Sequence, residues 1–551
     1  MIHTVTSRSQ FLLVALAAII WFSLLGYRDL FEPDEGRYAE ISREMVASGD
    51  WLTPRLDGFK YFEKPALQYW ATAAGFVLFG ESNATARLWP AIIGFLGALF
   101  IWFAGDRLYG RNAGFIGFIL TLSCLFYATL SHIITLDLAV SVFMVMGIGC
   151  LALAQSRRED PAYVRRWMLL GWGALALATL TKGLIGLVLP AGAVLFYSLW
   201  QRDWALWKHL HLGKGLLLVL AMTAPWFIAV SIKNPTFAHF FFIHEHVDRY
   251  LSPIGHDRVE PWWFFFANFF LGALPWFFIM LRTLVQPGFS WRQGNKNQFN
   301  SERFFWVFCI FVFVFFSFSS SKLPPYILPM FPVLALLAGK RLANETWDKW
   351  NRLDALLMLV MAVSFLATVF IIPKTVTDAF QLQIDLHLRP WLYAASGLML
   401  ISTILFFRSN RQKLHSLATS GLLVLLAIQM LSWGFQVLSP IKSSRQLADA
   451  IRPYLQADTK IYSVEIYYPQ SLPFYLQRTI TLVHYQGELA MGIKLEPERW
   501  IKNADLFKQQ WLATRHAVAV MSPDRYEKFK QQSLPMHPIY ETPKLIAVLK
   551  P

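Results

Sequence analysis

The sequence predicts an α-helical polytopic membrane protein with about 13 transmembrane helices, followed by a small α/β domain. Hydrophobic residues make up 55% of the 551 residues and charged residues only 15%, far from the balance of a soluble domain. Apolar runs of about 20 residues, the length that crosses a bilayer, recur from Phe11 to Phe435 between short polar connectors. After residue 436 these runs stop and short β-rich segments replace them.

Positive charges set the expected orientation of the spans. The net charge is +15, but Lys and Arg occupy mainly alternate short connectors, which argues against a nucleic-acid partner. By the positive-inside rule these connectors are cytoplasmic. The first apolar run, Phe11 to Tyr27, follows Arg8 without a small-residue cleavage site, so we interpret it as a retained anchor and place the N-terminus in the cytoplasm.

The remaining connectors and the tail are expected on the opposite side of the membrane. We therefore predict a transmembrane catalytic domain over residues 1–436, with a large first outer loop at 28–86, and an outer α/β domain over 437–551. In that tail, Lys460 to Val464, Thr479 to Val483 and Ala517 to Met521 have strand-like patterns. Ser444 to Leu455 and Asp505 to Ala513 have helical patterns.

The first outer loop contains the densest group of candidate functional residues. It begins Phe-Glu-Pro-Asp-Glu-Gly-Arg-Tyr at residues 31–38, and the segment from Glu35 to Ala47 has the periodicity of a helix lying on the membrane surface. Asp34 can be interpreted as the N-cap of that helix. Because another acid, an arginine and a tyrosine follow within four positions, capping alone does not account for the motif.

Further along the same loop, Glu63 and Lys64 precede an apolar run from Ala66 to Gly80. That run is short for a span and suits an interfacial or re-entrant helix. Lys64 is then positioned to meet a lipid phosphate, because an ammonium on a flexible stem suits such a headgroup. The alternative is a solvated ion pair at a helix start.

Several other charged residues fall in outer segments. Asp137 lies at the outer end of a span, where a carboxylate is costly, so it either has a function or anchors a neighbouring helix. Lys182 is either a cavity residue or, as we favour, an interfacial lysine that snorkels to water. Lys322 and Tyr326 lie in a Pro-rich turn and are candidates for phosphate contacts.

The segment from residue 239 to residue 250 combines histidines, acids and Arg249 beside aromatic residues. The guanidinium of Arg249 is suited to bidentate binding of a phosphate. His244 and His246, with Glu63, form a candidate zinc site, although loop histidines are more often hydrogen-bonded structural groups. We expect no cofactor to be required, and a divalent metal such as zinc remains a candidate.

Three motifs together resemble one family. They are Pro33-Asp34-Glu35-Gly36-Arg37-Tyr38-Ala39-Glu40-Ile41, Glu63-Lys64-Pro65, and Ser321-Lys322-Leu323-Pro324-Pro325-Tyr326-Ile327-Leu328-Pro329. In this order they resemble the bacterial undecaprenyl phosphate-4-amino-4-deoxy-L-arabinose transferases, which modify lipid A and belong to the protein O-mannosyltransferase superfamily. The resemblance covers essentially the whole chain and implies the C-type glycosyltransferase fold, with juxtamembrane helices on the periplasmic side of the bacterial inner membrane.

The resemblance also implies a reaction and a site. An aminoarabinose would pass from undecaprenyl phosphate to a lipid A phosphate at the periplasmic face, giving resistance to polymyxin and other cationic peptides. Because the acceptor phosphate is already an anionic nucleophile, we expect Asp34 to orient the donor rather than act as a base, with inversion at the anomeric carbon. The predicted site comprises catalytic Asp34, Asp137 and Glu63; phosphate-binding or lipid-binding Lys64, Arg249, Tyr326 and Lys322; cavity residues Glu35, Arg37, Tyr38 and Tyr61; and metal candidates Glu63 and His244.

Two alternatives stay open at this point. A related polyprenyl-phosphate transferase with another sugar or a protein hydroxyl acceptor would carry the same motifs, and Asp34 would then act as a true base. A lipid transporter or flippase would also have many helices and intramembrane charges. Such proteins usually show internal repeats and helices broken near the midplane, and the sequence shows neither.

Overall fold

The computed structural model describes residues 7–248, 260–290, 296–344, 349–375, 379–408, 414–465 and 468–551. The chain divides into two compact units. The first unit contains residues 1–25, 63–68 and 88–434, and the second contains residues 26–62, 69–87 and 435–551. Most of the 28–86 loop is thereby grouped with the C-terminal residues.

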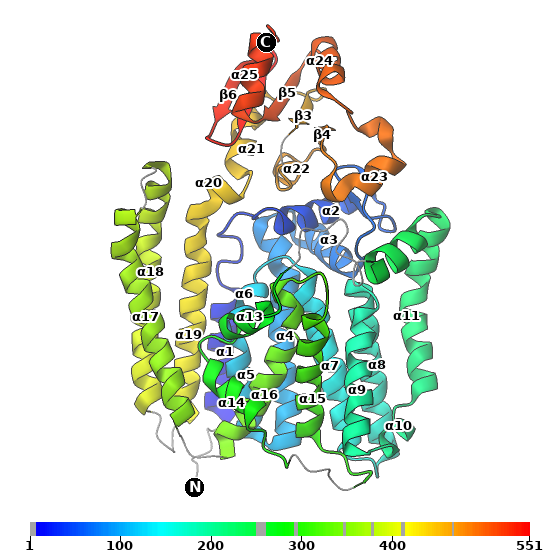
Figure 1. Ribbon diagram of the computed structural model, residues 1–551, viewed down its shortest axis with the longest axis vertical. Helices are drawn as coiled ribbons and strands as arrows, with labels where there is room; N and C mark the ends of the chain where they lie inside the picture. Colours follow the sequence, from blue (N-terminus) through cyan, green and yellow to red (C-terminus); the bar gives the residue numbers. More distant parts are fainter. Residues whose placement is uncertain are drawn as a thin grey trace. The chain divides into compact units, whose positions relative to one another are not determined.

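The first unit is built of helices, apart from its connecting loops (Figure 1). They are α1 (Ser7–Phe22), most of α4 (Asn83–Tyr109), α5 (Arg111–Leu122), α6 (Leu125–Leu130), α7 (Leu136–Gln155), α8 (Pro161–Lys182), α9 (Ile185–Gln201), α10 (Ala205–Lys208), α11 (Leu212–Lys233), the π-helix η1 (His239–Asp248), α13 (Phe264–Gly272), α14 (Phe277–Val285), α15 (Ser301–Ser317), the 3-10 helix η2 (Pro324–Ile327), α16 (Met330–Asn344), α17 (Lys349–Thr375), α18 (Ala379–Arg408) and α19 (Leu414–Gly434).

Within the described residues, six helices are long and apolar enough to cross a membrane. They are Asn83–Tyr109, Leu136–Gln155, Leu212–Lys233, Lys349–Ile371, Asp385–Arg408 and Leu414–Lys442. Shorter apolar helices include Leu67–Phe79, which confirms the short helix expected after Lys64.

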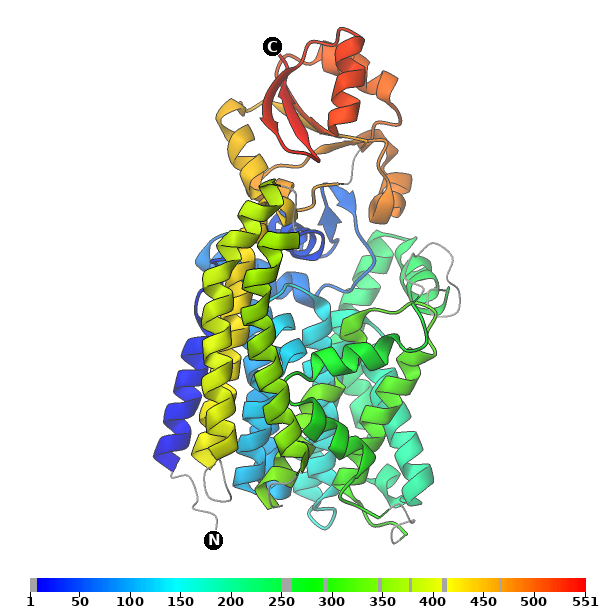
Figure 2. The same ribbon diagram turned by 60° about the vertical axis from the view of Figure 1, so that its left-hand side comes forward.

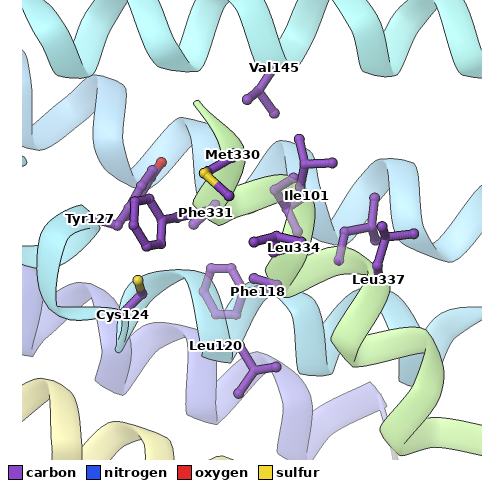
Figure 3. Packing of buried hydrophobic residues seen from close by; sticks show 14 of the residues in the cluster. Ile101, Phe118, Leu120, Cys124, Tyr127, Val145, Met330, Phe331, Leu334 and Leu337 are labelled. Carbon is purple, nitrogen blue, oxygen red and sulfur yellow. The ribbon is translucent and has the colours of Figure 1, made fainter. Parts of the chain in front are cut away.

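Close packing of apolar side chains holds the first unit together. Figure 3 shows Ile101 of α4, Phe118 of α5, Val145 of α7 and Leu334 of α16 pointing toward one another, and each is at most 3% exposed. A Cβ atom on Gly339 would lie 2.5 Å from the backbone oxygen of Ala113, so α16 approaches α5 more closely than a larger residue permits. Small residues at such crossings allow the backbone contact on which helix packing in lipid depends.

The second unit combines helices with two sheets. Its elements are α2 (Asp34–Ser48), β1 (Arg55–Leu56), β2 (Phe59–Lys60), most of α3 (Leu67–Phe79), η3 (Phe435–Leu438), α20 (Ser439–Lys442), α21 (Arg445–Ile451), η4 (Arg452–Tyr454), β3 (Lys460–Val464), α22 (Leu472–Leu476), β4 (Thr481–Val483), η5 (Gly487–Leu489), α23 (Ala490–Leu495), η6 (Pro497–Arg499), α24 (Ala504–Ala513), β5 (Ala517–Met521), α25 (Pro523–Gln531), β6 (His537–Glu541) and β7 (Ile546–Leu549).

The larger sheet has the strand order β4-β3-β5-β7-β6, and Figure 2 shows its strands with α25 beside them. β3 runs parallel to β4 and β5, whereas β7 is antiparallel to β5 and β6. In a buried core, Phe507 and Trp511 of α24 pack on Tyr462 of β3, and Phe529 of α25 packs on Phe507. The three strands expected from the sequence are confirmed, whereas β6 and β7 were not expected.

Helix α2 confirms the helix expected after Pro33, and the protein itself buries most of it. Its residues from Glu35 to Met45 are all buried. Gly36 lies so close to α22 that an added Cβ would meet the backbone nitrogen of Ser471 at 2.6 Å. Other segments of the second unit therefore cover α2, and its expected position at the membrane surface stays a prediction.

Candidate functional site

An ion pair joins two helix ends in the first unit. Asp137 lies in the first turn of α7, and Lys182 is the last residue of α8, where acidic and basic residues respectively complement the helix dipole. The Lys182 ammonium donates to the Asp137 carboxylate, and the two side chains are 18% and 15% exposed. The expectation that Lys182 snorkels to water was therefore wrong, because a carboxylate holds its ammonium.

Tyr326 extends this pair into a group of three side chains. The Lys182 ammonium lies 4.7 Å from the centroid of the Tyr326 ring, and a cation over an aromatic face is attracted by the ring quadrupole. Tyr326 belongs to η2, which starts at Pro324, and its ring centroid is 4.8 Å from that of Phe316. The structure thus brings together Asp137 and Tyr326, two of the predicted site residues, through a lysine that the sequence did not assign to the site.

A second ion pair in the first unit involves Lys64. Its Nζ atom lies 3.0 Å from Oε2 of Glu245 and donates at 2.9 Å to the backbone oxygen of Glu63. The Glu63 carboxylate is farther away, at 3.9 Å. Glu245 belongs to η1, and its side chain is only 3% exposed. The sequence did not predict Glu245 as the partner of Lys64, because the only local feature of Glu245 is its place between two histidines.

The remaining predicted residues of this unit are placed separately. The Lys322 ammonium donates to the backbone oxygen of Glu260 at 3.0 Å. His244 is half exposed, and its Nδ1 atom lies 3.7 Å from Oε1 of Glu245. Arg249 and the side chain of His246 lie outside the described residues. Within the described part, no group of three His, Cys, Asp or Glu side chains is placed to hold a metal, so zinc at Glu63 and His244 stays a prediction.

In the second unit, Asp34 is the first residue of α2 and not its N-cap. The capping position is Pro33, and no side chain there accepts a capping hydrogen bond. The Asp34 side chain is 49% exposed and lies 3.6 Å from Nη1 of Arg37, one helical turn away. The capping interpretation of Asp34 was therefore wrong, and this carboxylate is left accessible at the beginning of a buried helix.

Arg37 links α2 to the C-terminal part of the second unit. Its Nε atom donates to Gln470 at 2.7 Å and its Nη2 atom donates to Glu488 at 2.7 Å. Burial by itself would lower the pKa of Arg37, but nearby Tyr61, Tyr38 and acidic side chains raise it well above its usual value. Arg37 is therefore a fixed cation, and it is buried together with Tyr38 and Tyr61.

Glu35 forms a buried cluster with two arginines. Nη1 of Arg28 lies 2.7 Å from one carboxylate oxygen, and Nε of Arg87 lies 2.7 Å from the other. Burial alone would raise the pKa of Glu35, but the two guanidiniums outweigh it and lower the pKa to about 2. Glu35 is 1% exposed and is held by these two arginines, which indicates a structural role, and its expected place in the substrate cavity stays a prediction.

The fold and these groups define the class of protein. Residues 6–241 match the family model of dolichyl-phosphate-mannose-protein mannosyltransferases, and residues 447–550 match that of the aminoarabinose transferase C-terminal domain. The helical membrane unit and these two matches together identify the protein as a membrane-embedded glycosyltransferase.

Relatives narrow the class to one family. The crystal structure of ArnT from Cupriavidus metallidurans bound to undecaprenyl phosphate is similar with a TM-score of 0.89 and 32% identity, over 99% of both chains. The undecaprenyl phosphate-alpha-4-amino-4-deoxy-L-arabinose arabinosyl transferases of Erwinia tasmaniensis and Proteus mirabilis are 33% and 28% identical. The first match covers 63% of this chain and 62% of the relative, and the second covers 92% of both. The chain belongs to the ArnT family of aminoarabinose transferases.

Proposed function

We propose that this protein transfers 4-amino-4-deoxy-L-arabinose from undecaprenyl phosphate to a phosphate group of lipid A. The donor is supported by the names of the similar transferases and by the ArnT structure that holds undecaprenyl phosphate. The lipid A acceptor and the resulting resistance to polymyxin follow from the family resemblance of the three motifs. We further propose about 13 spans, a cytoplasmic N-terminus, and a site and C-terminal segment that face the periplasm.

The observation that carries this proposal is that two lysines beside apolar helices are each paired with a carboxylate, Lys64 with Glu245 and Lys182 with Asp137. An ammonium such as that of Lys64 or Lys182 is suited to the phosphate of a lipid-linked donor. In the reaction, the bond between the anomeric carbon and the undecaprenyl phosphate oxygen breaks, and a lipid A phosphate oxygen forms the new bond from the opposite face. Negative charge grows on the departing phosphate, and a fixed cation stabilises it.

We assign the carboxylates to positioning the donor. A phosphate nucleophile carries no proton that must be removed at neutral pH, so neither Asp34 nor Asp137 is needed as a general base. Asp137 is already bound to the Lys182 ammonium, which suits it to orienting that cation. Asp34 is half exposed, which suits it to contact with a substrate group such as the sugar's ammonium.

Reconstitution tests the proposed function directly. The purified full chain is incorporated in lipid with lipid A and a native mixture of polyprenyl-linked sugars, and the product is analysed by mass spectrometry. We expect an added mass equal to one aminopentose on lipid A. Addition of a different sugar, or modification of a protein hydroxyl in place of lipid A, would point to a sibling enzyme and overturn the substrate assignment.

A further inference from the structure

A cavity of about 120 Å³ lies in the first unit, where α14 and α16 end and α15 begins. Lys340 and Arg341 line it from the last turns of α16, whereas η2, which carries Tyr326, precedes the first turn of that helix. With a rise of about 1.5 Å per residue, Met330 and Lys340 are about 15 Å apart along α16. The cavity is therefore separate from the groups described above.

One side of the cavity is apolar and aromatic. Phe289, Trp306 and Leu337 line it, and the rings of Phe289 and Trp306 meet edge to face with their centroids 6.1 Å apart. The indole nitrogen of Trp306 donates to the backbone oxygen of Leu284 at 2.9 Å, which fixes the ring. Trp side chains are enriched where a membrane meets water, because the ring is apolar and its N–H needs a polar partner. This side therefore suits the first methylene groups of a lipid chain.

The other side carries charges that the protein holds in place. The Lys340 ammonium donates to the Glu302 carboxylate and lies 5.0 Å from the centroid of the Tyr109 ring. Nη1 of Arg341 donates to the backbone oxygen of Gln286, the C-cap residue of α14, at 2.7 Å. The last carbonyl groups of a helix have no partner within it, so a basic side chain is favoured there. Two cations and one carboxylate line the cavity, and its lining is therefore net positive.

The volume and the position of the cavity indicate the class of ligand. A volume of about 120 Å³ is that of about four water molecules, which is enough for a phosphate group but not for a whole lipid. The membrane-spanning part of α17 begins at Lys349, shortly after α16 ends at Asn344. Basic pockets between helices at the level where spans begin can bind lipid headgroups. A free anion would gain nothing from the apolar side.

We propose that this cavity binds the phosphate of an anionic phospholipid of the surrounding membrane, at a site separate from the lysines assigned to the sugar donor. The guanidinium of Arg341 contacts the phosphate, while Lys340 stays with Glu302 and adds positive charge beside it. Phe289 and Trp306 contact the start of the acyl chains, which lie along the outside of the helices. The topology proposed above puts this site in the cytoplasmic leaflet, whose surface is negative because of its anionic lipids.

Lipid binding to the full chain, purified in neutral detergent, tests this site. Phosphatidylglycerol is titrated, and the lipid-bound fraction is measured by native mass spectrometry. We expect Arg341→Gln to bind this lipid about tenfold more weakly than the wild type, the usual effect of losing a hydrogen bond from a charged donor. Arg352→Gln is the matched control, because Arg352 is an exposed cation of α17 that does not line the cavity. The control should bind as the wild type does.

Changes at Asn344 vary the charge of the cavity and leave the contacts of Arg341 in place. Asn344 is exposed and lines the cavity. Asn344→Asp adds a negative charge with nearly the same shape, and Asn344→Lys adds a positive one. We expect the affinity for phosphatidylglycerol to fall about fivefold in the first variant and to rise about fivefold in the second. A general loss of folding cannot produce the rise.

Two further ligands identify the chemistry that the cavity recognises. Inorganic phosphate should not displace phosphatidylglycerol, because it makes no contact with Phe289 and Trp306. Phosphatidylcholine, which has no net charge, should bind about tenfold more weakly. Displacement by inorganic phosphate at equal concentration, or equal binding of phosphatidylcholine, would overturn the anionic phospholipid as the ligand. Equal affinities of the wild type, Arg341→Gln and both Asn344 variants for phosphatidylglycerol would overturn the cavity as its site.

Sugar-transfer kinetics distinguish this site from that of the donor. The KM for the lipid-linked sugar should be the same in the wild type and in all four variants, because the cavity lies away from the donor's lysines. A raised KM in Arg341→Gln and Asn344→Asp would make the cavity part of the donor site and overturn the inference. A wild type that transfers no sugar, but binds phosphatidylglycerol as described, would contradict the proposed function and leave the lipid site supported.

Discussion

Asp137 and Lys182, 45 positions apart in the chain, form an ion pair between the first turn of α7 and the last residue of α8. The same ammonium lies against the ring of Tyr326. Because both side chains are largely buried, each depends on the other for its charge and its position. This pair gives the first unit a fixed polar group among apolar helices.

Loss of either member of this pair should slow sugar transfer. Asp137→Asn and Lys182→Met should each lower the rate of sugar transfer by about 100- to 1,000-fold, the usual loss when a stabilising charge is removed from an active site. Because the two residues act as a unit, the double variant should lose little more than either single variant. Initial transfer rates in lipid measure this, with Asp106→Asn, an exposed acid on α4, as the control. Losses that multiply would show that the two residues act independently.

Asp34→Asn should abolish transfer without unfolding the protein. Its side chain is half exposed and no hydrogen bond caps α2 at Pro33, so the change removes a charge and spares the helix start. The measurement is transfer activity together with the elution profile and yield of the purified variant. An active, normally folded Asp34→Asn protein would refute the donor-orienting role.

Glu35→Gln should destabilise the second unit. Removing one member of a buried ion pair leaves the other charges unpaired and costs about 3–5 kcal/mol, and here two guanidiniums, those of Arg28 and Arg87, lose their anion. Thermal unfolding of the purified chain should show a lower midpoint. Asp505→Asn breaks an exposed pair with Lys508 and should leave the midpoint unchanged. Equal midpoints for Glu35→Gln and the wild type would contradict a structural role for Glu35.

A buried carboxyl cluster in the second unit should make its stability fall as pH rises. Glu44 accepts from the backbone nitrogen of Gly58 at 2.9 Å, and Asp57 accepts from that of Ile480 at 2.6 Å. The pKa values of both carboxyl groups are raised well above their usual values, mainly by burial. The neighbouring Glu40 carboxylate raises both pKa values further, whereas the positive charge of Arg43 lowers them.

The sign of this effect follows from proton binding. Below pH 4 both the folded and the unfolded chain hold these protons, whereas at higher pH only the folded chain keeps them. Deprotonation through the raised pKa values therefore removes stability as pH rises. Glu35 has the opposite sign: its contribution is present above its unfolded pKa and is lost only as pH falls toward 2.

The measurement is the unfolding midpoint of the purified chain between pH 5 and pH 9. We expect the midpoint to fall across this range in the wild type and to fall less in Glu44→Gln, which mimics the protonated side chain. Hydrogen exchange in α2 should follow the same trend. A midpoint that is flat in both proteins, or steeper in Glu44→Gln, would show that the cluster is already ionised.

Part of the site could be predicted from the sequence. Lys64 and Asp137 stand out in the local sequence, because a charge beside a long apolar run costs free energy and therefore usually has a function. The strands at residues 460–464 and 517–521 were also predictable from their β-rich patterns. By contrast, β6 contains Pro538 and a register shift, which obscures the alternation that identifies a strand.

The sequence by itself determined that most of this protein lies in lipid, and this environment in turn determined its helical secondary structure. Long apolar runs in lipid must pair their backbone groups within the segment and so form helices. Only the tertiary structure decided which charges meet: Lys182 with Asp137, Lys64 with Glu245, and Glu35 with two arginines. Except for Arg28 and Glu35, which are 7 positions apart, these pairs join residues far apart in the chain, and their formation depends on how the side chains of packed segments meet. No local pattern records that geometry.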